Sequence, residues 1–243
     1  MGFGAVDIGN TSIKFYIWGD GGEWSSLPKS LSEVVDVFRE RGVDKVAYCT
    51  TRHLDSAERR LIEDEGWWGL SATEPLPLKI EYSTPATLGL DRLAAALGAH
   101  ARFPSETVLI ADIGTALTLD VVTAGGVFKG GNISPGLTMR LKALHHYTSK
   151  LPEVESLICE GLLGSDTTGA IQLGALWGVA NEIGGMFRLV KRDMGCDAVV
   201  LTGGDAPFMR SYVKKALAGE ARLEWEHALV AEGLKIAYDY NHE

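Results

Sequence analysis

Two acidic glycine turns have the residue types and spacing for phosphate chemistry: Asp7-Ile8-Gly9-Asn10-Thr11 and Asp112-Ile113-Gly114-Thr115-Ala116. Each follows an apolar run and precedes a second β-rich run, so one strand–turn–strand unit occurs twice. Glycine lets the backbone approach a ligand, and successive N–H groups and short hydroxyls cradle phosphate oxygens. An aspartate at a strand end can hold a cation or its waters beside those phosphates. Either turn alone could be a plain hairpin, but the repetition favours a two-sided grip on a polyphosphate.

A third glycine turn, Thr202-Gly203-Gly204-Asp205, also follows an apolar strand and precedes an expected helix. This arrangement places a helix N-terminus and bare backbone against a ligand. Taken alone, an ordinary strand-to-helix turn is the simpler interpretation. Together with the two acidic turns, it predicts a platform for a nucleoside.

A phosphotransferase also needs a base near the acceptor hydroxyl, and Asp91 is the best candidate. It begins an alanine-rich segment that is expected to be helical, after an approach bent by Pro85 and Gly89. An aspartate is also favoured at a helix start as an anion alone. Arg92 beside it could bind a carboxylate in bidentate fashion or simply be solvated.

Strands alternate with helices in two similar halves, which predicts an α/β duplication with domains at residues 1–104 and 105–243. Residues 71–88 carry three prolines and cannot form a regular helix. The expected helices are 31–41, 54–65, 90–102, 137–148, 167–191, 206–218 and 226–240. The expected strands after the first hairpin are 46–49, 107–112, 117–123, 127–130 and 198–202, with a glycine-rich turn over 130–136.

Composition narrows the function class. The formal net charge is −9 and the pI is near 5.2, without a basic tract, which argues against binding nucleic acid or an anionic membrane through a charged face. Cys49, Cys159 and Cys196 are scattered and form no C-x-x-C pair, so neither a zinc site nor a disulfide framework is expected. The N-terminus opens directly into a strand, and no apolar run reaches the roughly 18 residues of a membrane span. We therefore expect a reduced, cytoplasmic protein.

The three turns together resemble those of the actin-like ATPase and sugar-kinase superfamily, which implies two ribonuclease-H-like halves with ATP in the cleft between them. Further motifs resemble type III pantothenate kinases specifically and occur in that family's order. The motifs are Asp-Ile-Gly-Asn-Thr-Ser-Ile-Lys at 7–14, Tyr-x-x-Pro-x-x-Leu-Gly-Leu-Asp-Arg at 82–92, Asp-Ile-Gly-Thr-Ala-Leu-Thr-Leu-Asp at 112–120, Gly-Gly-Asn-Ile-Ser-Pro-Gly at 130–136, the segment 143–152, and Thr-x-x-Ala-Ile-Gln-x-Gly at 167–174. Thr84 departs mildly from the family, whose members often carry Asn before this proline.

The resemblance implies ATP-dependent phosphorylation of pantothenate at its primary hydroxyl, the first step of coenzyme A synthesis. It implies that Asp91 is the general base and that a monovalent cation, K⁺ or NH₄⁺, binds at Asp112. It also implies a homodimer that pairs the long helices of the second half, with the pantothenate pocket at the interface. The implied ATP-binding residues are Asp7 (also near Mg²⁺), Ile8, Gly9, Asn10, Thr11, Ser12, Ile13, Lys14 and Thr115. The implied pantothenate-binding residues are Tyr82, Gly89, Leu90, Asp91, Arg92 and Thr167, with Thr168 as an alternative to Thr167.

Two other functions stay open from the sequence. One is another small-molecule kinase of the same superfamily, for example one that acts on a sugar. The other is a non-catalytic accessory or regulatory protein built on this fold. The intact aspartates at positions 7, 91 and 112 argue against loss of catalysis.

Overall fold

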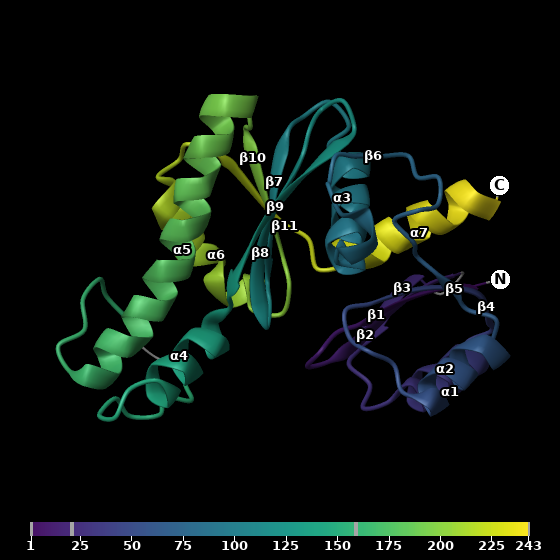
Figure 1. Ribbon diagram of the computed structural model, residues 1–243, viewed down its shortest axis with the longest axis horizontal. Coiled ribbons are helices and arrows are strands. Elements are labelled where there is room, and N and C mark those ends of the chain that lie inside the picture. The colour runs from purple at the N-terminus through teal and green to yellow at the C-terminus, as the bar shows by residue number, and fades with distance from the viewer. Residues whose placement is uncertain (1, 20–21, 158–159, 243) are drawn as a thin grey trace. The chain divides into compact units, whose positions relative to one another are not determined.

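The structure is a computed structural model that describes residues 2–19, 22–157 and 160–242. The chain divides into two compact units (Figure 1). The first unit comprises Met1–Pro104, Ala124–Lys129 and Ala228–Glu243, and the second comprises Ser105–Thr123 and Gly130–His227. The assignment of residues 1–104 and 105–243 as two ribonuclease-H-like halves stays a prediction.

The first unit is built on a five-stranded sheet in the order β3-β2-β1-β4-β5. Its central strand β1 pairs antiparallel with β2 and parallel with β4. The buried cluster of this unit joins apolar side chains of these strands, such as Val6 and Phe15, to Val34 and Phe38 on α1. The elements are β1 (Gly2–Ile8), β2 (Ile13–Gly19), β3 (Gly22–Ser26), α1 (Leu31–Glu40), β4 (Val43–Thr50), α2 (Ser56–Asp64), β5 (Trp68–Gly69), β6 (Lys79–Ile80), the 3₁₀ turn η1 (Pro85–Thr87), α3 (Leu90–Arg102) and α7 (Leu229–His242).

Helices α3 and α7 pack closely because glycines lie at their contact. A Cβ on Gly98 of α3 would lie 2.3 Å from the carbonyl oxygen of Leu229, and one on Gly233 of α7 would lie 1.8 Å from that of Ala94. Only hydrogen at these positions lets the two backbones approach so far. Helix α7 is thereby anchored on α3, whose first turn contains Asp91.

The second unit contains a sheet in which β7 pairs antiparallel with β8 and parallel with β10, in the order β11-β10-β7-β8-β9. At the start of β9, Val127 and Phe128 belong to the first unit and pair with β6. Helices α5 and α6 lie along this sheet (Figure 1), and their apolar faces join its strands in one buried cluster. The elements are β7 (Val108–Ile113), β8 (Ala116–Val122), β9 (Val127–Pro135), α4 (Leu137–His146), α5 (Thr167–Met194), β10 (Ala198–Thr202), α6 (Ala206–Leu217) and β11 (Arg222–Trp225).

The repeated strand–turn–strand unit is confirmed. Both β1–β2 and β7–β8 are antiparallel hairpins. Each acidic residue belongs to the last but one residue pair before the turn, with Asp7 opposite Lys14 and Asp112 opposite Thr118. Each turn glycine closes the hairpin with its N–H: Gly9 donates to the Ser12 carbonyl and Gly114 to the Ala116 carbonyl, both at 3.0 Å.

The expectation of a turn over residues 130–136 is wrong except at Gly136, because β9 continues to Pro135. A Cβ on Gly131 would lie 1.8 Å from the Leu119 carbonyl oxygen, so this glycine permits a close strand approach. Four strands, β3, β5, β6 and β11, were not predicted, because two to five residues are too few for a periodic pattern. Residues 71–88 contain only η1 and β6 as regular structure, as their prolines indicated.

Cys49 and Cys196 are buried free thiols, whereas Cys159 lies outside the described residues. Within residues 2–19, 22–157 and 160–242, no helix combines the length and apolar character that crossing a bilayer needs.

Candidate active site

Asp7 is an acidic group of the first unit whose pKa is raised by burial. It lies at the carboxyl end of β1, level with Cys49 on β4 and Lys14 on β2. Burial raises the pKa of its carboxyl to about 6, the positive charge of Lys14 opposes this rise, and the negative charge of Asp91 adds to it. The Cys49 thiol donates to Asp7 Oδ1 at 3.7 Å and favours the ionised form. A carboxyl poised near neutrality in this way is typical of a functional site.

The turn after Asp7 presents its tip to solvent. Asn10, Thr11 and Ser12 are exposed, whereas the Ile8 and Ile13 side chains belong to the core. The two isoleucines can therefore contribute to a ligand only through backbone atoms. Because the Gly9 N–H already closes the hairpin, a ligand of this turn would meet the exposed tip residues first.

Asp91 lies in the first turn of α3, where its position is fixed by local contacts. Its Oδ1 accepts a hydrogen bond from the Arg92 N–H at 2.8 Å. A Cβ on Gly89 would lie 2.7 Å from this same oxygen, so glycine makes room for the carboxylate. Asp91 also acts electrostatically on Asp7, which shows that the fold brings the two acidic motifs of the first unit into one region.

Arg92 is buried, with 5% of its surface exposed. Its guanidinium lies over the Tyr82 ring, 5.8 Å from the centroid, which is a cation–π contact. The expectation that Tyr82 and Arg92 both bind pantothenate stays a prediction. The alternative that Arg92 is simply solvated is wrong.

A cavity of about 630 Å³ opens beside these residues, within the first unit. Its walls come from the phosphate turn at Asn10, the β4–α2 turn at residues 50–53, the segment 70–73, and the approach to α3 at residues 85–90. The volume is in the range of small-molecule sites. Hydroxyl and amide groups alternate with leucines along the lining, so the cavity suits a ligand with both polar and apolar parts.

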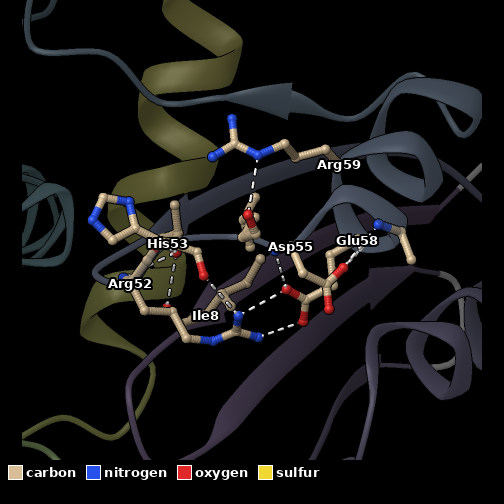
Figure 2. A network of polar contacts seen from close by, with 9 residues as sticks. Ile8, Arg52, His53, Asp55, Glu58 and Arg59 are labelled. Atoms are coloured by element: carbon tan, nitrogen blue, oxygen red, sulfur yellow. Dashed lines mark hydrogen bonds and ion pairs between the residues drawn. The ribbon is translucent and has the colours of Figure 1, made fainter.

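The β4–α2 turn is held rigidly. The Thr51 N–H donates to the Ile8 carbonyl at 3.1 Å, which joins this wall to the end of β1. The Arg52 guanidinium pairs with both carboxylate oxygens of Glu58, at 2.8 and 2.6 Å (Figure 2). Glu58 also accepts from the Asp55 N–H, and Asp55 caps the start of α2 in return. The wall is thereby fixed to both the sheet and a helix.

In the second unit, the other acidic turn meets two glycine turns. A Cβ on Gly203 would lie 2.4 Å from Asp112 Oδ1, and the Asp205 N–H donates to the Ile113 carbonyl at 2.9 Å. The Gly136 N–H donates to the Thr115 carbonyl at 3.2 Å. The Thr115 side chain is exposed. The acidic turn at residues 112–116 is therefore in direct contact with the Gly203 turn and with Gly136.

Thr167 is the first residue of α5, directly after the capping residue Asp166. Thr167 and Thr168 are both exposed. The choice between them as a substrate contact stays a prediction.

Asp7 and Asp91 are carboxylates that could hold a divalent cation together with the phosphates of a ligand. No group of three or more histidine, cysteine, aspartate or glutamate side chains gathers in metal-binding geometry in the described part of the chain. Magnesium often binds through one or two carboxylates together with substrate phosphates. Asp7, with Asp91 in the same region, fits that pattern.

The walls at residues 50–53 and 70–73 were missed by the sequence analysis. A signal was available for the first, since Thr50 and Thr51 end an apolar strand. Ligands of α/β sheets bind beyond the carboxyl ends of parallel strands, and β4 runs parallel to β1.

Comparisons with known proteins show which family the chain resembles. Residues 5–189 match the family model described as type III pantothenate kinase. A type III pantothenate kinase of Cytophaga hutchinsonii is 35% identical over 214 residues, 87% of this chain and 90% of the relative. One from Bacteroides fragilis is 34% identical over 246 residues, 97% of each chain.

Solved structures show the fold. A conserved Baf family protein from Campylobacter jejuni aligns with TM-score 0.62, 21% identity and 98% coverage of both chains. A dehydratase activator from Clostridium difficile with bound ADPNP aligns with TM-score 0.57, 16% identity and coverage of 100% and 96%. A ROK family glucokinase from Streptomyces griseus aligns with TM-score 0.53, 15% identity and 99% of each chain. The predicted duplicated α/β fold of the actin-like ATPase type is confirmed.

Proposed function

We propose that this chain, which belongs to the type III pantothenate kinase family, phosphorylates pantothenate with ATP and uses Asp91 as the general base. The reaction transfers the γ-phosphoryl group to the primary hydroxyl of pantothenate and gives 4′-phosphopantothenate and ADP, the first step of coenzyme A synthesis. The observation that carries the assignment of Asp91 is its place in the first turn of α3, next to Gly89 and Leu90 of the cavity wall, where its charge also acts on Asp7.

Asp91 is suited to accept the hydroxyl proton. Its carboxylate is oriented by the Arg92 N–H and by the space that Gly89 leaves. As the pantothenate oxygen bonds to the γ-phosphorus, the bond to the β-phosphate oxygen breaks and the hydroxyl proton passes to Asp91. Positioning and electrostatics supply most of the rate in such a transfer.

The cavity is the proposed acceptor pocket. Gly89 and Leu90 line it next to Asp91, and Asn10 of the first phosphate turn lines it from another side. A pantothenate hydroxyl held near Asp91 would therefore face the turn that we assign to ATP. Arg92, stacked on Tyr82, is the proposed partner of the pantothenate carboxylate.

Two cations complete the proposed site. Mg²⁺ bound near Asp7 would neutralise charge on the phosphates, and a monovalent cation, K⁺ or NH₄⁺, would bind at Asp112. Residues 8–14 and Thr115 hold the phosphates in this proposal. Support comes from the pKa of Asp7, which an approaching cation would lower, and from the close contact of the Gly203 turn with Asp112.

We also propose a cytoplasmic homodimer in which Thr167 contributes to the pantothenate site. Large apolar side chains around α4 and the loop before α5 support an interface: Tyr147, Leu162 and Leu163 are 82%, 68% and 84% exposed. Sedimentation velocity tests the assembly, since a monomer at micromolar concentration would exclude it.

Substitution of Asp91 tests the base. Asp91→Asn keeps the shape and the acceptor for the Arg92 N–H but cannot take a proton, so we expect kcat to fall by roughly 10²–10⁴-fold with little change in ATP affinity. Asp36→Asn, at an exposed position of α1, is the matched control. Full turnover by a folded Asp91→Asn enzyme would eliminate the base assignment, and turnover of a hexose in place of pantothenate would identify a sugar-type kinase.

A further inference from the structure

A polar network in the second unit joins the end of the 130–136 motif to two charged residues outside the motifs, Arg140 and Glu182. Ser134 at the end of β9 donates to Glu182 Oε1 on α5 at 2.5 Å. Arg140 on α4 pairs with the other oxygen of Glu182 and donates from Nη2 to Ser134 Oγ at 3.3 Å. One network therefore joins a strand end, a short helix and the middle of the longest helix.

The network grips the backbone of the β9–α4 turn directly. Arg140 Nε donates to the Pro135 carbonyl at 2.8 Å. The helix also makes room for this arginine, because a Cβ on Gly178 of α5 would lie 3.2 Å from Nη1. The Arg140 and Glu182 side chains are 22% and 31% exposed. A partly buried pair that also satisfies a backbone carbonyl holds its geometry better than an exposed pair.

The β9–α4 turn that Arg140 contacts packs in its turn against the second acidic turn, at residues 112–116. Gly136 follows Pro135, and its N–H donates to the Thr115 carbonyl. A Cβ on Gly136 would lie 2.1 Å from the Gly114 carbonyl oxygen and 2.7 Å from that of Thr115. The two backbones are in van der Waals contact, so a shift of one turn displaces the other.

We propose that Arg140 and Glu182 are positioning residues for the Gly114-Thr115 turn, acting through Ser134, Pro135 and Gly136. The inference rests on the proposed ATP contact at Thr115. A displacement of about 1 Å at a reacting centre can reduce catalysis on the order of 10²-fold, so a brace that fixes this turn contributes to ATP binding without touching the nucleotide.

The test compares Arg140→Met with Arg140→Lys and a matched control. Arg140→Met removes every donor, whereas Arg140→Lys keeps the charge opposite Glu182 but loses the Nε bond to Pro135. Arg188→Met is the control, because Arg188, on α5, likewise pairs with a glutamate, Glu220 at 3.0 Å, and donates to a backbone carbonyl, that of Ala216 at 2.7 Å. The substitution therefore removes similar contacts from the same unit. Neither partner of Arg188 belongs to the glycine turns at residues 112–116 and 202–205.

The readouts are the Kd of Mg·ATP by isothermal titration calorimetry, the separate KM values and the midpoint of thermal unfolding. We expect Arg140→Met to raise the Kd and KM for ATP about tenfold, Arg140→Lys to lie between it and wild type, and the KM for pantothenate to change less than about twofold. Arg188→Met should leave the Kd for Mg·ATP unchanged. If Arg140→Met does not fold, two smaller changes test the same prediction: Ser134→Ala, which removes the two hydrogen bonds of the Ser134 hydroxyl, and Glu182→Gln, which removes the charge opposite Arg140.

Thr115→Ala separates the failure of this inference from the failure of the proposed function. If Thr115→Ala weakens Mg·ATP binding while the Arg140 variants do not, the positioning role is refuted and the ATP contact stands. If neither weakens binding, the assignment of this turn to ATP is refuted, and the positioning role with it. Equal weakening by Arg140→Met and Arg188→Met, in step with lost thermal stability, would also refute the positioning role.

Discussion

The raised pKa of Asp7 makes a quantitative prediction for nucleotide binding. Burial raises this pKa from 3.8 to about 6, with a contribution from Asp91. A cation beside Asp7 needs the ionised carboxylate, so below pH 6 binding must also remove a proton. Each pH unit below the pKa costs about 1.4 kcal/mol, which is a factor of about ten in affinity. We therefore expect Mg·ATP to bind roughly tenfold more weakly at pH 5 than at pH 7 because of Asp7 alone.

Isothermal titration calorimetry with Mg²⁺ and a non-hydrolysable ATP analogue, from pH 5 to pH 7.5, measures this effect. Protonation of the analogue itself affects all variants equally. The quantity of interest is therefore the ratio of the Kd of wild type to the Kd of Asp7→Asn at each pH, with Asp36→Asn as a control. Measurement at pH 5 in two buffers of different ionisation enthalpy should also show release of close to one proton by wild type. The same pH dependence in wild type and Asp7→Asn would refute the placement of the cation beside Asp7.

Because the folded-state pKa of Asp7 is raised, its contribution to stability is full below about pH 4 and is lost as the pH rises through 6. The ligand-free wild type should therefore lose about 1–3 kcal/mol relative to Asp7→Asn between pH 4 and 7 in urea titrations, and parallel curves would contradict this. Gly98→Ala should destabilise by about 1–3 kcal/mol through its clash with Leu229, whereas Gly185→Ala, with no atom within 4 Å of the added Cβ, should be neutral or slightly stabilising; equal melting temperatures would contradict the packing argument. Asp112→Asn should abolish the difference in turnover between K⁺ and Na⁺, and an undiminished difference would place the monovalent cation elsewhere.

The parts of the fold that the sequence predicted are those with a long or repeated pattern. Helix 90–102 and strand 198–202 have the predicted bounds, because an alanine-rich run and an unbroken apolar run leave few alternatives. The paired turns were recognisable since the same residue types recur after two apolar strands. Short strands such as β5 and β6 carry no period and form only through their partners.

Site residues that lie close together in one sequence motif could be predicted. Site residues that come together only through the fold could not. The sequence placed Asp91 at a helix start and Asp7 at a strand end, but only the structure shows that Asp91 raises the pKa of Asp7. The Arg52–Glu58 pair and the Arg140–Glu182 network depend on side-chain geometry between separate elements. No spacing rule identifies either pair in one sequence, because surface charges of both signs are common.

The most direct test of the central claim is ADP release by the purified protein with ATP, Mg²⁺ and pantothenate, in K⁺ or NH₄⁺ compared with Na⁺ alone. The account predicts turnover that requires pantothenate, that is highest with K⁺ or NH₄⁺, and that yields one phosphopantothenate for each ADP. Release of ADP at the same rate without pantothenate, or no turnover of pantothenate with any cation, would contradict the account.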